Sequence, residues 1–176
     1  MTSVLERCRT VRAVSPPAGS ALACFYDEAT FVDAFAVRLD GSGPHDLDRL
    51  AARAIERPGA GLRAALGLRD AMVSRLGLKT SDAIRHRLLA ERGDRVGFFP
   101  VKSRGTREII LGEDDRHLDF RLSISLQTAP GGETDLVATT VVHCNNGFGH
   151  IYLAAIMPGH KLIVPSMLRK AVRARD

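Results

Sequence analysis

The sequence predicts an α+β domain in which a curved antiparallel sheet of about six or seven strands is covered on one face by a C-terminal helix. Strand-like segments between residues 95 and 157 are separated by only a few residues. Such short connections join antiparallel neighbours, because a parallel crossover needs about a dozen residues or more. The segment 117–126 alternates between apolar and polar residues, which indicates a sheet with one buried face. An amphipathic segment, 160–173, follows all the strands.

The chain begins with a polar stretch, residues 1–20, which contains two consecutive prolines and predicts a flexible leader or an edge segment. Residues 21–176 are expected to form a single domain. Its first expected strand is 31–39 (FVDAFAVRL), because its residues alternate. One face of that strand carries Phe31, Asp33, Phe35, Val37 and Leu39.

Two helices are expected next, which gives the element order β-α-α-(β)5-α. Residues 46–57 follow the helical repeat, with Asp46 or Ser42 as the N-cap and Pro58–Gly59 as the end. Residues 62–76 form a second amphipathic segment that ends at Gly77, where a left-handed C-terminal cap is favoured. Residues 80–90 allow a third short helix.

Five strands are then expected, joined by turns rich in Gly, Asn, Asp and Pro. They are 95–101, 107–111, 117–126, 135–144 and 150–157. Asn145-Asn146-Gly147 predicts the last hairpin turn, since Asn and Gly tolerate positive φ. In 117–126 the core face is Leu118, Phe120, Leu122, Ile124 and Leu126. The opposite, solvated face is His117, Asp119, Arg121, Ser123 and Ser125.

The closing helix, 160–173, contains Pro165, so it either kinks there or begins near that residue. It is the only long candidate after the strands to cover the apolar side of the sheet. A curved sheet that holds one amphipathic helix leaves a cavity between them. Concave and mostly apolar cavities are the default ligand sites.

Composition bounds the class of protein. The chain has 176 residues, 45% apolar and 26% charged, which is typical of one globular domain. Its net charge of +5 identifies no acidic partner, and without a groove-reading motif we expect no nucleic acid. We expect no membrane span, since no stretch is predicted to be long and apolar enough to cross a bilayer. We expect no cofactor, since the sequence has no glycine-rich phosphate loop. Three cysteines without paired spacing favour a reducing cytoplasm.

Four stretches together carry a resemblance to a known family: 96–101 (VGFFPV), 110–123 (ILGEDDRHLDFRLS), 139–144 (TTVVHC) and 162–165 (LIVP). They resemble the bacterial family called domain of unknown function 2867, over about residues 20–171. The resemblance implies a helix-grip fold, similar to the Bet v 1 and polyketide-cyclase (START-like, SRPBCC) superfamily of lipid and small-molecule binders. It brings no established activity or catalytic residue.

The leading hypothesis is a domain that binds a small, largely apolar ligand between the sheet and the last helix. The expected ligand-binding residues are Phe98, Phe99, Phe120, Leu122, His143, Tyr152 and Met167. Phe98 and Phe99 are neighbours on a strand, so only one of them points inward. Tyr152 would add a hydroxyl group to the apolar lining.

Two alternatives stay open. His143, with Asp119 or Tyr152 as helper, could serve a cyclase, dehydratase or hydrolase on the same scaffold. A homodimer could instead form through the exposed sheet face or an edge strand.

A metal is not expected. His117, Asp119 and His143 offer the residue types of an iron site, but Asp119 is favoured to pair with Arg121 on a polar face. The acidic run Glu113-Asp114-Asp115 lacks the further spaced ligands of a calcium loop and is favoured as a solvated turn.

Overall fold

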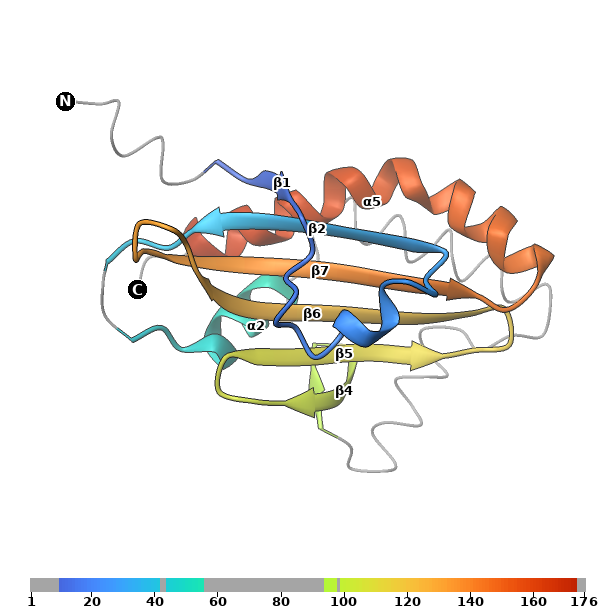
Figure 1. The fold of residues 1–176 in the computed structure, drawn as a ribbon, viewed down its shortest axis with the longest axis horizontal. Coiled ribbons are helices and arrows are strands. Elements are labelled where there is room, and N and C mark those ends of the chain that lie inside the picture. Colours follow the sequence, from blue (N-terminus) through green and yellow to red (C-terminus); the bar gives the residue numbers. More distant parts are fainter. Residues whose placement is uncertain (1–9, 42–43, 56–93, 98, 174–176) are drawn as a thin grey trace.

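The computed structural model describes residues 10–41, 44–55, 94–97 and 99–173. Within them one antiparallel sheet has seven strands in the order β1-β2-β7-β6-β5-β4-β3. The strands are β1 (Arg12–Val14), β2 (Phe31–Arg38), β3 (Arg95–Val96), β4 (Phe99–Arg104), β5 (Glu108–Asp114), β6 (Leu118–Thr128) and β7 (Thr134–Cys144). The helices α2 (Leu47–Ile55) and α5 (Gly147–Arg173) lie on one face of this sheet (Figure 1). The predicted α+β helix-grip fold is confirmed.

The core lies between the sheet and these two helices. Leu122, Ile124 and Leu126 of β6 pack there with Leu168 of α5, as the alternation of β6 predicts. Asp46 caps α2, since its Oδ1 accepts a hydrogen bond from the backbone N–H of Arg49 at 3.0 Å. The expected helices 62–76 and 80–90 lie outside the described residues.

The opposite, outer face of the sheet is less exposed than the alternation predicts. Ser123 and Ser125 are completely buried there. The segment between β1 and β2, which includes the short 3-10 helix η1 (Ala23–Phe25), crosses this face (Figure 1). Glu108 holds the segment down, because its carboxylate accepts hydrogen bonds from the Ser20 hydroxyl and the Ala21 N–H. The prediction of a solvated face is therefore wrong where this segment covers the sheet.

The last predicted strand, 150–157, is wrong, because those residues belong to α5. Asn146 does not form a hairpin turn but caps the helix, its Oδ1 accepting a hydrogen bond from the Gly149 N–H at 3.0 Å. Asn serves both roles, so its type alone does not distinguish a turn from a helix start. Pro165 neither begins nor ends the helix, and α5 follows a bent path over the sheet (Figure 1).

The predicted strand 95–101 is divided in the structure. Gly97 has φ of 61°, a conformation that glycine adopts without strain, and it separates β3 from β4. Phe98 lies outside the described residues. The other strands of the meander begin or end a few residues from their predicted bounds, and β5 runs on to Asp114.

As a single helix, α5 is longer than the sequence prediction allows for. Its 27 residues include an 18-residue window with mean hydropathy 1.3, which meets the length and composition of a membrane span. The expectation that no stretch is long enough rested on dividing this segment into a strand and a shorter helix. Only 22% of this window is buried, although part of α5 packs on the sheet. One such helix is weak evidence of a membrane span.

Candidate functional site

A cavity of about 140 Å³, partly open to solvent, lies between α5 and the inner face of the sheet. The sheet supplies apolar side chains from β4, β6 and β7, and α5 supplies a second apolar wall. The lining residues include Phe99, Phe120, Leu122, Ala138, Tyr152 and Met167. The rings of Phe99 and Phe120 contact each other with centroids 5.5 Å apart, which fixes one wall.

Most of the predicted ligand-binding residues line this cavity. Phe99, Phe120, Leu122, Tyr152 and Met167 all do so. Of the neighbouring pair, Phe99 contributes to the lining, and Phe98 lies outside the described residues. That these residues bind a ligand stays a prediction.

His143 does not line the cavity, because it lies on the outer face of the sheet. It borders a separate hollow of about 170 Å³ together with Glu28, Asp119 and Arg121. Its Nδ1 is 3.0 Å from the backbone oxygen of Glu28. The register of β6 and β7 places Asp119 directly opposite His143, so these two do share a face. Tyr152 lines the cavity under the opposite face, so the three residues do not converge on one pocket.

His117 is also placed differently from the prediction. It precedes β6, is 3% exposed, and packs under α5 with its ring 5.5 Å from Phe148 and 5.2 Å from Tyr152. Its Nδ1 is 3.6 Å from Oδ2 of Asp115. The expectation that His117 shares the polar face of Asp119 is wrong, because β6 begins only at Leu118 and His117, just before it, packs under α5.

The cavity also has a polar side that sequence reasoning missed. Asp33 of β2 contacts His160 of α5, with Nε2 of His160 3.1 and 3.0 Å from the two carboxylate oxygens. Thr140 of β7 is directly opposite Asp33 in the sheet register. Both His160 and Thr140 line the cavity. The sequence held one signal, since Asp33 is the single charged residue on the otherwise apolar face of its strand.

Comparison with known proteins supplies the family. A family model described as "Protein of unknown function (DUF2867)" matches residues 25–167. The chain belongs to this family. No curated protein and no solved structure matches it significantly.

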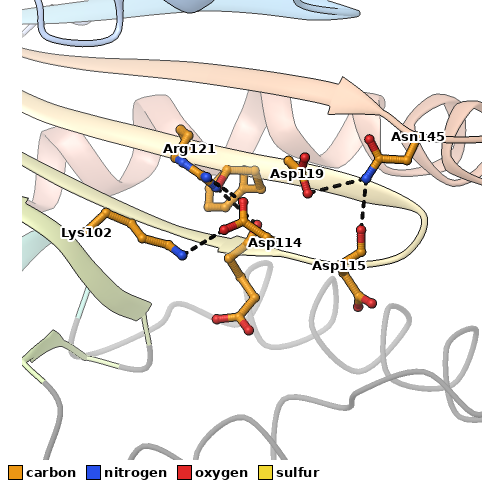
Figure 2. Close-up of polar contacts among 8 residues, drawn as sticks. Lys102, Asp114, Asp115, Asp119, Arg121 and Asn145 are labelled. Atoms are coloured by element: carbon orange, nitrogen blue, oxygen red, sulfur yellow. Dashed lines mark hydrogen bonds and ion pairs between the residues drawn. The ribbon is translucent and has the colours of Figure 1, made fainter.

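In this DUF2867 protein the acidic run Glu113-Asp114-Asp115 spans the end of β5 and the start of the turn that follows, and it makes ion pairs and turn contacts. Asp114 accepts a hydrogen bond from Lys102 Nζ at 2.9 Å and pairs with Arg121 (Figure 2). The expected pairing of Arg121 with Asp119 is wrong, because Asp119 instead accepts a hydrogen bond from Asn145 Nδ2 at 3.3 Å (Figure 2).

The charge of Asp114 is stabilised by these contacts. Partial burial alone raises the pKa of its carboxyl group, but the hydrogen bonds from Lys102 and Arg121 outweigh it and hold the pKa below the usual 3.8. In the described part of this DUF2867 chain no three His, Cys, Asp or Glu side chains are placed to hold a metal ion. His117 is separated from Asp119 and His143, because it lies under α5 and they lie on the outer face.

Proposed function

We propose that this DUF2867 protein binds a small, largely apolar molecule in the cavity under α5. The observation that carries the proposal is the cavity itself, of about 140 Å³ and lined mainly by apolar side chains. Apolar cavities of about 150 Å³ hold ligands of the size of benzene. We also propose that the chain is related to the Bet v 1 and polyketide-cyclase superfamily and that residues 21–176 form one domain. We propose further that the protein is bacterial and cytoplasmic.

The test is a titration with benzene, followed by chemical-shift changes in the protein and by thermal denaturation. We expect a dissociation constant of about 0.1–1 mM, which is about 4–5.5 kcal/mol of binding free energy. That lies below the ceiling of about 1.5 kcal/mol per atom for the six atoms of benzene. The probe should shift resonances of cavity residues such as Leu122 and Met167. A wild-type protein that binds neither benzene nor toluene would overturn the proposal.

A matched pair of variants locates the binding. Ala138→Leu extends a side chain from β7 into the cavity and should abolish benzene binding while the protein stays folded. Ala155→Leu makes the same change at an exposed position of α5 and should bind as the wild type does. Benzene affinity that survives in Ala138→Leu would place the ligand elsewhere.

The two alternatives have less support. An enzyme built on His143 would have Asp119 beside it on the outer face, but Tyr152 and the cavity under α5 lie on the opposite face of the sheet. A dimer stays a prediction, and the outer face through which it was expected is partly covered by the segment before β2.

A further inference from the structure

One position in the wall of the cavity breaks its apolar pattern. Asp33 lies on the face of β2 that turns toward α5, between Phe31 and Phe35. A carboxylate on a buried face is costly unless it is paired and hydrogen-bonded. His160 meets that need, since its Nε2 is within 3.1 Å of both oxygens.

The pairing with Asp33 fixes which nitrogen of His160 is left for another partner. A carboxylate only accepts, so Nε2 carries the proton that it donates to Asp33. In the neutral imidazole Nδ1 is then an acceptor, and it makes no hydrogen bond within the described residues. Phe31 holds the ring from the side, with centroids 5.6 Å apart and the planes at 90°.

Thr140 supplies the second group. It is 2% exposed, and its Oγ1 has no hydrogen-bond partner among the residues the structure describes. Buried hydroxyl groups are almost always paired, so an orphaned one beside a cavity needs a reason. The register places Thr140 opposite Asp33, and directly opposite residues have Cβ atoms about 4.5–5.5 Å apart.

We propose that His160 and Thr140 form a polar end of the cavity that recognises a hydroxyl group on an apolar ring, as in a phenol. This rests on the proposed binding function and names the class of ligand. The ligand hydroxyl donates to Nδ1 of His160 and accepts from the hydroxyl of Thr140, which satisfies both with one group.

Other polar groups fit less well. A carboxylate on the ligand would be repelled by Asp33 across the sheet register. An ammonium group would compete for Asp33, whose two oxygens already lie within reach of His160. A carbonyl group only accepts, so it would leave Nδ1 of His160 without a donor.

The experiment compares phenol with benzene, which fill nearly the same volume, by calorimetry or chemical-shift titration. Wild-type protein should bind phenol about tenfold more tightly than benzene. Thr140→Val replaces the hydroxyl with a methyl group of similar size and should lower the ratio of phenol to benzene affinity from about ten to about one. Thr139→Val is the control, because Thr139 is an equally buried and unpartnered threonine that does not line the cavity, and it should keep the preference.

The outcomes separate this inference from the function on which it rests. Benzene binding with no preference for phenol, or a preference that Thr140→Val leaves intact, overturns the polar end but not the cavity as a binding site. If the wild-type protein binds neither phenol nor benzene, the polar end and the cavity as a binding site are both overturned. If Thr140→Val does not fold, Asp33→Asn gives the same reading, since it releases the fixed tautomer of His160 and should also reduce the preference for phenol.

Discussion

Gly149 lies where the first turn of α5 approaches the backbone of His117, just before β6, so we expect Gly149→Ala to destabilise the fold. An added Cβ would lie 2.1 Å from the backbone oxygen of His117, whereas ordinary contact begins at 3.4 Å. The helix start or the residues before β6 would have to move by about 1.3 Å. That movement would disturb the hydrogen bond from Asn145 N–H to the same oxygen, which is 2.9 Å long.

The net effect follows from two opposing contributions. Overpacking against an atom that cannot rotate away costs about 3 kcal/mol, at the upper end of the usual range. Replacing glycine by alanine in a helix returns about 1 kcal/mol. We therefore expect the free energy of unfolding to fall by about 2 kcal/mol, measured by urea denaturation followed by circular dichroism.

Gly147 gives a matched control two residues earlier in the same helix. A Cβ added there meets no atom within 4 Å, so Gly147→Ala should be neutral or slightly stabilising. A Gly149→Ala variant as stable as Gly147→Ala would contradict the close approach of α5 to His117.

Three further changes have separate expected outcomes. Asp135→Ala should lower the free energy of unfolding by about 1–2 kcal/mol, because it removes a buried carboxylate that accepts a 2.7 Å hydrogen bond from Arg38. An unchanged urea midpoint would contradict this. Asp114→Asn should cost about 0.5 kcal/mol at pH 7, since the pair with Arg121 is half exposed and screened. Because the pKa of Asp114 is lowered in the fold, its contribution is present above the usual 3.8 and is lost as pH falls through the lowered pKa, so the two urea midpoints should converge in acid. Leu168→Ala should cost about 2–5 kcal/mol and widen the cavity, so that toluene gains affinity relative to benzene.

The layers of the fold could be predicted because they depend on periodic burial. The alternation in 117–126 identified the core face of β6 correctly. A polar residue at every second position is a pattern that an amphipathic helix does not produce. The start of α5 could not be predicted in the same way, because Asn146 suits a hairpin turn as well as a helix cap. The apolar run after it has the length of a strand as well as of two helical turns.

The candidate site was predicted in part for a similar reason. Phe120 and Leu122 follow from the strand pattern, and Tyr152 was placed in the lining although its element was mistaken. The pairing of Asp33 with His160 joins two residues 127 positions apart, and only the path of α5 over β2 brings them together. A charged residue on an apolar strand face is the local sign that such a partner exists.

The two prolines of α5 have a consequence for how a molecule reaches the cavity. Pro158 and Pro165 each lack the N–H that would bond to the carbonyl of Ala154 and Lys161, respectively. The stretch between the two prolines carries His160, Ile163 and Val164, which line the cavity. This part of α5 therefore lacks two of its backbone hydrogen bonds. Bending of this stretch can thus widen the way into the cavity while the strands stay paired. Amide exchange between the two prolines should be faster than in the uninterrupted turns on either side of them.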